Sequence, residues 1–327
     1  MDRRTLMTAA PVLMLATLVG QRTPAFARTV RPAVRAENDQ LTFLWQSTGT
    51  PDPLIQPYGV GVDLDGNVWV ADEQDRFQII APDGTFQETW GTSGAGDGQF
   101  TFFNSNAAYA RGYGDVAFDA AGNIYVTDTG NTRVQKFSPD RTFLLSWGNK
   151  GTADGQFLTP SGIAVGPDGT VYVSDEGRSD IQRFDAEGQF LGTIAEKGRD
   201  EGQLSLPAGI AVGPDGDIWV ADYSNQRIQR FSASGEFRDA WGQGGSGDGE
   251  FRNPNGVAVN PLGQVFVADA DNNRLQVFNS DGQLVAMIGS YGTKPGQFSN
   301  ALGVAAGDDG SVYVTDRHSL QAFQLQS

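Results

Sequence analysis

The stretch PAGIAVGPDGDIWVADYSNQRIQRFSASGEFRDAWG, residues 207–242, decides the fold. It contains four short runs that are rich in Val, Ile and aromatic residues, and turn residues such as the pair Asp215 and Gly216 separate them. β-Branched and aromatic residues favour strands, and Asp-Gly pairs favour tight turns between antiparallel strands. The stretch therefore predicts one unit of four antiparallel strands.

The same unit recurs along most of the chain. Its second strand ends in the phrases VWVAD, IYVTD, VYVSD, IWVAD, VFVAD and VYVTD, whose last residues are Asp72, Asp128, Asp175, Asp222, Asp269 and Asp316. The spacing between successive aspartates is 56 residues once and 47 residues four times. A period of about 40 to 50 residues with strand content is typical of propeller blades. The sequence predicts an all-β protein, a six-bladed β-propeller with four antiparallel strands per blade.

The ends of the repeat region predict how the ring closes. The last unit stops after LQAFQLQ, which matches a third strand, whereas LTFLWQS at residues 41–47 matches the fourth strand TFLLSWG at residues 142–148. We expect residues 41–47 to pair with residues 320–326, so that both ends of the propeller share one blade. This pairing would remove an exposed sheet edge, which is otherwise an aggregation hazard. The predicted propeller domain spans residues 41–327.

Residues 1–27 are predicted to be an export signal, and residues 28–40 a linker. Arg3 and Arg4 precede the short apolar run AAPVLMLATLVG, and Ala25 and Ala27 supply the small residues of a cleavage site. The arginine pair is similar to a twin-arginine signal, and a general secretory signal stays open because the later lysine is absent. The apolar run is shorter than the roughly 20 residues of a membrane span. We expect a periplasmic or secreted protein with no membrane span after cleavage.

Composition excludes several classes of function. The chain of 327 residues has Lys+Arg 23 against Asp+Glu 39 and a formal net charge of −16, so it would repel nucleic acid. It has no Cys and a single His, which excludes disulfides, thiolate metal sites and sites with several histidines. No cofactor is predicted, and a calcium ion bound through carboxylates stays open.

The repeat resembles the NHL repeat over residues 41–327. Each unit follows P-x-G-[IV]-A-V-x-P-x-G-x-[VI]-[WYF]-V-x-D, then N-x-R-[IV]-Q, then W-G-x-x-G-x-G-x-G-[QE]-F, with departures from blade to blade. The resemblance implies a six-bladed propeller, but no single activity, because the family includes protein-binding, RNA-binding, sensor and lyase members. The amidating lyase of this family holds its metal through several histidines, which this chain lacks.

Features present in every unit are predicted to be structural. The aspartates that end the second strands are expected to accept backbone N–H groups from the loop between the second and third strands. The segment DLDGN at residues 63–67 resembles the start of a calcium-binding loop, but the later glutamate is absent and its Asp-Gly pair falls on a turn that other units share. We therefore expect a structural turn there.

Asp115 is a clear departure from the repeat. The other units carry a glycine at this position, namely Gly59, Gly162, Gly209, Gly256 and Gly303. One interpretation is a local substitution, since aspartate tolerates positive φ better than most residues. The other places a carboxylate in the axial opening, where it would need a partner such as Arg111 or Arg178. On this interpretation Asp115 is a candidate catalytic residue and a candidate calcium ligand.

Further departures gather on one rim of the predicted ring, where propellers generally bind ligands. They are the insertion at residues 101–114, the sequence EGRSD in the third unit and the pair Arg317 and His318 in the sixth. The predicted binding residues are Tyr58, Arg111, Tyr113, Asp115, Glu176, Arg178, Tyr223, Asn255 and Arg317. His318 is a second catalytic candidate as a general base, with an ordinary surface role as the alternative.

Two classes of function follow. The first is an exported binding module that holds an unknown protein, peptide, glycan or small molecule on its rim. The second is a propeller enzyme, a lyase or a hydrolase, with its site at the axial opening. Binding is favoured because no set of nucleophile, base and oxyanion donors can be assembled from these residues.

Overall fold

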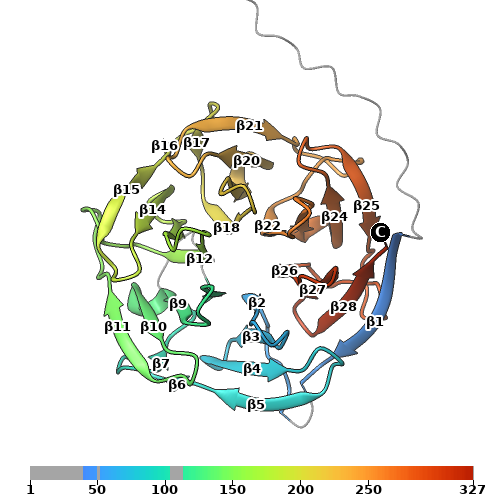
Figure 1. Cartoon of the computed structure of the whole chain (residues 1–327). Coiled ribbons are helices and arrows are strands. Elements are labelled where there is room, and N and C mark those ends of the chain that lie inside the picture. Colours follow the sequence, from blue (N-terminus) through green and yellow to red (C-terminus); the bar gives the residue numbers. More distant parts are fainter. Residues whose placement is uncertain (1–39, 50–51, 104–112, 327) are drawn as a thin grey trace, which may run out of the picture. The chain divides into compact units, whose positions relative to one another are not determined.

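The computed structural model describes residues 40–49, 52–103 and 113–326, which form six four-stranded antiparallel sheets. Figure 1 shows the sheets arranged as a ring, with the innermost strand of each sheet near the axis and the outermost strand along the circumference. The predicted six-bladed propeller is confirmed. We number the blades 1 to 6 in chain order. The predicted export signal and most of the linker lie outside the described residues and stay predictions.

Blade 4 shows how the repeat folds. Its strands are β18 (Pro207–Val212), β19 (Ile218–Asp222), β20 (Arg227–Phe231) and β21 (Phe237–Trp241). The first turn closes through a hydrogen bond from the Gly213 N–H to the Asp217 carbonyl, and Gly216 within it has a φ of 81°. Positive φ favours glycine, which explains the Asp-Gly pair at this turn.

The other blades repeat this order. Blade 1 contains β2 (Val60–Val62), β3 (Val68–Asp72), β4 (Arg76–Ile80) and β5 (Phe86–Trp90), and blade 2 contains β8 (Val116–Phe118), β9 (Ile124–Asp128), β10 (Arg133–Phe137) and β11 (Phe143–Trp147). Blade 3 contains β12 (Pro160–Val165), β13 (Val171–Asp175), β14 (Asp180–Phe184) and β15 (Phe190–Ile194), and blade 5 contains β22 (Pro254–Val259), β23 (Val265–Asp269), β24 (Arg274–Phe278) and β25 (Leu284–Ile288). Short parallel pairs and single 3-10 turns occupy several loops: β6 (Thr92–Ser93) with β7 (Gln99–Phe100), β16 (Glu196–Lys197) with β17 (Gln203–Leu204), η2 (Thr129–Asn131), η3 (Tyr223–Asn225) and η4 (Ala270–Asn272).

Blade 6 joins the two ends of the propeller. It contains β26 (Val304–Ala306), β27 (Ser311–Thr315) and β28 (Leu320–Leu325), and β1 (Leu41–Ser47) supplies the fourth strand. β1 pairs antiparallel with β28, from Leu41 opposite Leu325 to Ser47 opposite Leu320. The predicted closure by residues 41–47 is confirmed.

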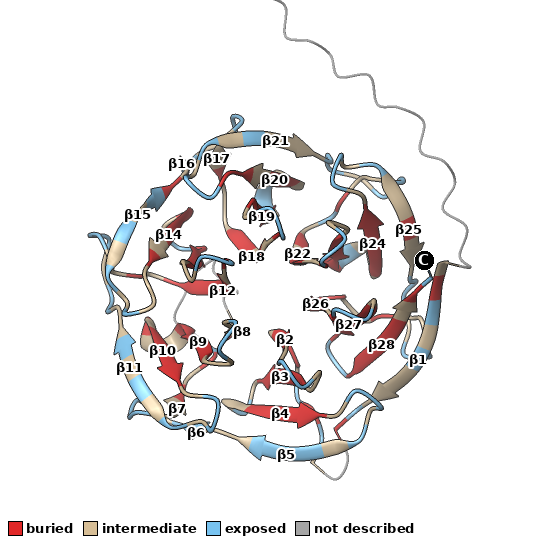
Figure 2. Ribbon diagram, in the orientation of Figure 1, coloured by how far each residue is buried: buried red, intermediate tan, exposed pale blue. Residues whose placement is uncertain are grey.

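The core lies between the blades. In β19 every residue is buried, whereas β21 is partly exposed, and Figure 2 shows the same contrast between inner and outer strands around the ring. Aromatic rings bridge neighbouring blades: Trp69 of blade 1 meets Phe118 of blade 2 edge to face, with ring centroids 5.5 Å apart. Burying a large apolar side chain contributes about 1.5 to 3 kcal/mol. The blades therefore form a packed support for their loops.

The aspartates that end the second strands hold two loops together. We call the loop that leads into a blade its entry loop, and the loop between the second and third strands its 2–3 loop. In blade 5 the buried Asp269 carboxylate accepts the Arg252 N–H of the entry loop at 2.7 Å and Asn272 Nδ2 of the 2–3 loop at 2.9 Å. Because both loops meet there, they emerge at one end of the ring, which we call the mouth.

The donors to these aspartates differ in part from the prediction. In blades 2, 4 and 5 the backbone N–H comes from the entry loop, through Thr101, Ser205 and Arg252, rather than from the 2–3 loop. The 2–3 loops of these blades bind the same carboxylate through asparagine side chains instead of backbone N–H groups. In blades 1, 3 and 6 the expected donors are found, because the N–H groups of Gln74, Arg178 and His318 donate to the aspartate of their own blade at 2.9 to 3.0 Å.

Candidate functional site

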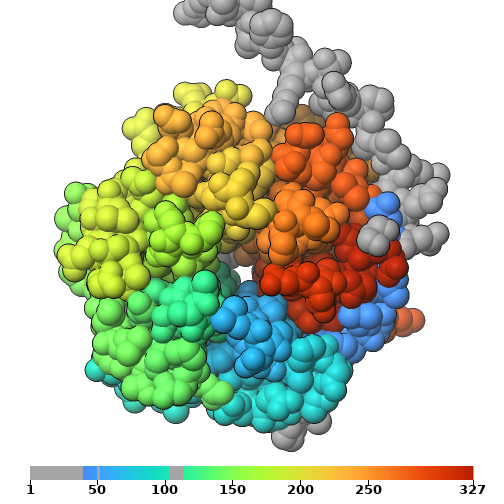
Figure 3. All heavy atoms as spheres, in the orientation of Figure 1, coloured from blue at the N-terminus to red at the C-terminus, as the bar shows by residue number. Residues whose placement is uncertain are grey.

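An axial cavity of about 640 Å³ is lined by the six innermost strands. Figure 3 shows an opening at the centre of the ring. In blade 1 the Ala71 N–H donates to the Gly59 carbonyl and the Asp63 N–H to the Asn67 carbonyl, so residues 59 and 63 point toward β3. Since backbone groups alternate along a strand, Val60 and Val62 present their N–H and C=O groups to the axis. The wall of the cavity therefore includes unpaired strand edges, with small side chains such as Ala164 between them.

Glycine is required where the backbones of neighbouring blades approach each other. A Cβ atom built on Gly303 would lie 2.1 Å from the Tyr58 carbonyl oxygen, and one built on Gly59 would lie 2.2 Å from the Gly114 carbonyl oxygen. Such contacts leave no room for a side chain directed toward the next blade. These glycines are explained by packing, without any ligand.

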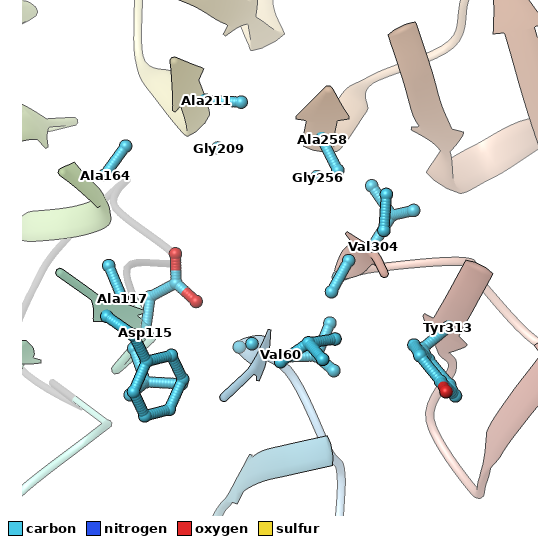
Figure 4. Close-up of a pocket in the computed structure, with 18 of the residues that line it drawn as sticks. Val60, Asp115, Ala117, Ala164, Gly209, Ala211, Gly256, Ala258, Val304 and Tyr313 are labelled. Carbon is cyan, nitrogen blue, oxygen red and sulfur yellow. The ribbon is translucent and has the colours of Figure 1, made fainter. Parts of the chain in front are cut away.

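Asp115 occupies the same position in blade 2 and directs its carboxylate into the axial cavity, as Figure 4 shows. Its backbone N–H donates to Thr127 Oγ1 at 2.8 Å, which fixes the start of β8. Its Oδ2 atom accepts the Ile163 N–H of blade 3 at 3.3 Å, and the N–H groups of Val60 and Val116 also donate to the carboxylate. One side chain thus satisfies strand-edge N–H groups from three blades.

Burial raises the pKa of the Asp115 carboxyl from 3.8 to about 7, and the three backbone N–H groups offset only part of this effect. The predicted pairing of Asp115 with Arg178 is wrong. The Arg178 N–H is anchored to Asp175, and its guanidinium folds back on Asp180 with a 2.8 Å ion pair. The other predicted partner, Arg111, lies outside the described residues. Asp115 is therefore a carboxyl group that titrates near neutrality inside a cavity.

A second cavity, of about 80 Å³, lies at the mouth and shares Tyr58, Tyr113 and Asn255 with the axial cavity. The rings of Tyr58 and Tyr113 are stacked, with centroids 3.3 Å apart and an interplanar angle of 5°. Burial raises the pKa of the Tyr58 hydroxyl well above its ordinary value, and the hydrogen bond with Tyr113 adds to this shift. Tyr223 and Arg317 complete the set, so the structure brings together five of the predicted binding residues.

Three other predicted residues line neither of these cavities. Glu176 is buried and accepts the Ser161 hydroxyl at 3.2 Å, and Arg178 is held by Asp180. The backbone N–H of His318 donates to Asp316 at 2.9 Å, and the residue is exposed. The structure does not bring His318 to Asp115, and its role as a general base stays a prediction.

Three polar residues of the mouth cavity were missed, Gln56, Asp271 and Asn300, together with the apolar Ala270 and Leu302. Asp271 accepts Asn300 Nδ2 at 2.9 Å and so links the 2–3 loop of blade 5 to the entry loop of blade 6. Asp271 lies in the variable part of the 2–3 loop, which is a signal that the sequence offers, whereas the φ of 69° at Asn300 is visible only in the structure. Gln56 carries no comparable signal in the sequence.

Metal binding and membrane crossing are addressed by two observations on the described residues. Within residues 40–49, 52–103 and 113–326, no group of three or more His, Asp or Glu side chains is arranged to hold a metal ion. In the same ranges, no helix has the length and apolar character needed to cross a membrane. Calcium binding by Asp115 stays a prediction.

Comparison with known families agrees with the repeat. The SMP-30/Gluconolactonase/LRE-like region family matches residues 96–246, and the NHL repeat family matches residues 251–278. A curated relative, peptidyl-glycine alpha-amidating monooxygenase A of Xenopus laevis, is 30% identical over 131 residues. That match covers 38% of this chain and 13% of the relative, so the chain spans a small part of the relative's length.

Solved structures share the fold at low sequence identity. A gluconolactonase from Xanthomonas campestris has a TM-score of 0.63 and 17% identity, covering 91% of this chain and 99% of that one. A virginiamycin B lyase from Staphylococcus aureus has a TM-score of 0.58 and 16% identity, covering 87% of this chain and 99% of that one. Fold and site together define a six-bladed propeller with an open axial cavity. The NHL repeat match over residues 251–278 and the six blades agree with the resemblance to NHL-repeat propellers that the sequence shows.

Proposed function

We propose that this protein is an exported ligand-binding propeller whose site is the mouth cavity together with the adjoining part of the axial cavity. The observation that carries the proposal is the convergence of Tyr58, Tyr113, Tyr223, Asn255 and Arg317 on one cavity. These residues occupy positions at which the blades differ, so the repeat itself does not require them.

The size and chemistry of the site favour a small molecule, or the end of a peptide or glycan chain. Ligand pockets of proteins are commonly about 300 to 1,000 Å³ and combine apolar walls with a few polar groups. The axial cavity of about 640 Å³ falls in this range, and the stacked tyrosines, amides and guanidinium supply such groups at its entrance.

The proposal is tested by a thermal-shift screen of the purified protein against monosaccharides, oligosaccharides, lactones and short peptides. We expect at least one compound to raise the melting temperature of the wild type and of Tyr291→Ala, but not that of Tyr223→Ala. Tyr291 is the matched control because it is 77% exposed and lines neither cavity. A compound that stabilises all three proteins equally would place binding elsewhere, and a screen without any stabilising compound would contradict the proposal.

A second candidate function is hydrolysis or elimination in the axial cavity, favoured by the Asp115 carboxyl. A group whose pKa is about 7 can serve as a general base at neutral pH. In hydrolysis of a lactone, for example, Asp115 would take a proton from the water that attacks the carbonyl carbon. The fold is shared with a lyase and a gluconolactonase, but at 16% and 17% identity this likeness carries the fold alone.

Turnover of a glucono-lactone by the wild type, Asp115→Asn and His318→Ala tests the catalytic alternative. We expect activity in the wild type that rises with pH through about 7, loss of activity in Asp115→Asn, and retained activity in His318→Ala, since His318 lines neither cavity. Equal activity of Asp115→Asn and the wild type would remove Asp115 as the base.

A further inference from the structure

Five blades hold their mouth-side arginine in an ion pair. In blade 5, for example, Arg274 Nε lies 2.7 Å from Asp269, and its side chain is only 8% exposed. The same arrangement holds in blades 1, 2 and 4, and in blade 3 the partner is two residues further along the chain. The five pairs are Arg76 with Asp72, Arg133 with Asp128, Arg178 with Asp180, Arg227 with Asp222, and Arg274 with Asp269. These guanidinium groups are occupied by the scaffold.

Blade 6 departs from this arrangement. Its arginine, Arg317, is the first residue of the 2–3 loop, one position after the structural aspartate Asp316. Arg317 is exposed, and no carboxylate of the described residues lies within ion-pair distance of its guanidinium. Asp316 accepts hydrogen bonds from Ser299 and Ser319 instead. In blade 6 Ser319 takes the position that Arg274 has in blade 5, and Arg317, at the loop position of Ala270, holds no scaffold carboxylate of the described residues.

Arg317 lines the mouth cavity. Among the described residues that line this cavity or the axial one, Arg317 is the only cation. Asn255 lines both cavities, and its side chain has no hydrogen bond to the described residues. The axial cavity carries negative charge further inside, at Asp115, and at its opposite end, where Asp308 and Asp309 lie. A ligand therefore meets one cation, Arg317, and one carboxylate, Asp271, at the mouth, and further carboxylates inside.

We propose that the mouth cavity recognises ligands that carry a single carboxylate, which Arg317 binds through its guanidinium. This inference rests on the proposed ligand-binding function and names the class of ligand. A planar guanidinium matches the geometry of a carboxylate, with two parallel N–H to O bonds. The other end of the ligand extends toward Asp115, which accepts hydrogen bonds from hydroxyl or amino groups there. Because a carboxylate near Asp115 would be repelled, the charges fix the direction in which the ligand enters.

The charge of the site favours a carboxylate over a phosphate. One guanidinium balances one negative charge, whereas a phosphate monoester carries about two at neutral pH. The second charge would lie near Asp271 and Asp115, and the described residues that line the cavities include no further cation. The protein as a whole carries a net charge of −16, which adds to the repulsion of a dianion.

Matched pairs of probes test the inference: glucuronate against glucose, and benzoate against benzamide, with glucose 6-phosphate as the dianion. Dissociation constants are measured by titration calorimetry or ligand-detected NMR, at fixed ionic strength, for the wild type, Arg317→Ala and Arg317→Lys. Arg252→Ala is the control, because Arg252 is an exposed arginine of the blade 5 entry loop that lines neither cavity. Melting temperatures verify that each variant folds.

We expect the wild type to bind at least one carboxylate about tenfold more tightly than its neutral partner, as hydrogen bonds between charged groups allow. This preference should vanish in Arg317→Ala, persist in part in Arg317→Lys, remain in Arg252→Ala and weaken as salt is added. Equal binding of charged and neutral probes, an undiminished preference in Arg317→Ala, or tighter binding of the phosphate would overturn the inference and leave the binding function standing. Failure of every probe and of the broader screen would remove both.

Discussion

Replacing Asp115 by asparagine tests the electrostatic account of the axial cavity. The substitution keeps the shape of the side chain and removes its charge. Since burial raises the pKa from 3.8 to about 7, the folded protein binds this proton more tightly than the unfolded chain does between these values. The stability of the wild type relative to Asp115→Asn should therefore fall as pH rises through this window, and the loss should be complete above pH 7.

The size of the effect follows from the shift. Three pKa units correspond to about 4 kcal/mol, which is an upper limit. Asp115 is partly exposed to the cavity, so screening by solvent should reduce the effect to about 2 kcal/mol. Only burial and backbone N–H groups contribute to the shift, with no charged side chain of the described residues among its causes. Other titrating groups act equally in both proteins and cancel in the difference.

The assay is urea unfolding of the wild type and Asp115→Asn at several pH values from about 4 to about 8. The pH-dependent part of the difference is the quantity of interest, because asparagine also changes the hydrogen bonds by a pH-independent amount. Asp281→Asn is the control, since Asp281 lies on an exposed turn between β24 and β25. A difference that stays constant with pH, or a wild type that gains stability toward pH 8, would refute the account.

Three further predictions concern the scaffold. Asp269→Ala should lower the free energy of unfolding by about 3 to 5 kcal/mol, because it leaves the buried Arg274 unpaired, whereas Asp281→Ala should change it by less than about 0.5 kcal/mol in the same urea titration. Gly303→Ala should lower the free energy of unfolding by about 1 to 3 kcal/mol, because its Cβ would clash with the Tyr58 carbonyl. Gly244→Ala is the control, since its Cβ would meet nothing nearer than 3.6 Å, and it should have the melting temperature of the wild type. Phe43→Ala should lower the free energy of unfolding by about 2 kcal/mol, because Phe43 of β1 packs on Phe323 of β28. Leu44→Ala is the control, since the neighbouring Leu44 is 45% exposed and should tolerate alanine. Equal melting temperatures for these two variants would argue against closure of the ring by β1.

The fold could be predicted because its information is repeated. A spacing of 47 residues, strand-forming runs and Asp-Gly turns all indicate the same blade, and the unmatched ends at residues 41–47 and 320–326 indicate their own pairing. Local propensity and the global arrangement agree at each of these positions, which is what makes a repeat easy to interpret. The donors to the aspartates were less predictable, since the entry loop that supplies Thr101 lies 27 residues before Asp128 in the chain.

The site could be located from the sequence, but not the directions of its side chains. Departures from the repeat correctly indicated Tyr58, Tyr113 and Arg317 as neighbours of one cavity. The same criterion selected Arg178, whose guanidinium pairs instead with Asp180, two residues later at the start of β14. In a loop, such short-range pairs decide where a charged side chain points, and the repeat pattern contains no information about them.

The donors around Asp316 explain how blade 6 can do without an arginine ion pair. A buried carboxylate that loses its only cation would be strongly destabilising. Asp316 avoids this penalty because it accepts the N–H groups of Ser299, His318 and Ser319 at 2.8 to 3.0 Å, together with the Ser319 hydroxyl at 3.1 Å. Neutral donors thus replace the guanidinium that holds the equivalent aspartate in blades 1, 2, 4 and 5. Ser319 therefore substitutes for the arginine of the Asn-x-Arg motif, and the guanidinium of Arg317, which no carboxylate of the described residues binds, is available to a ligand.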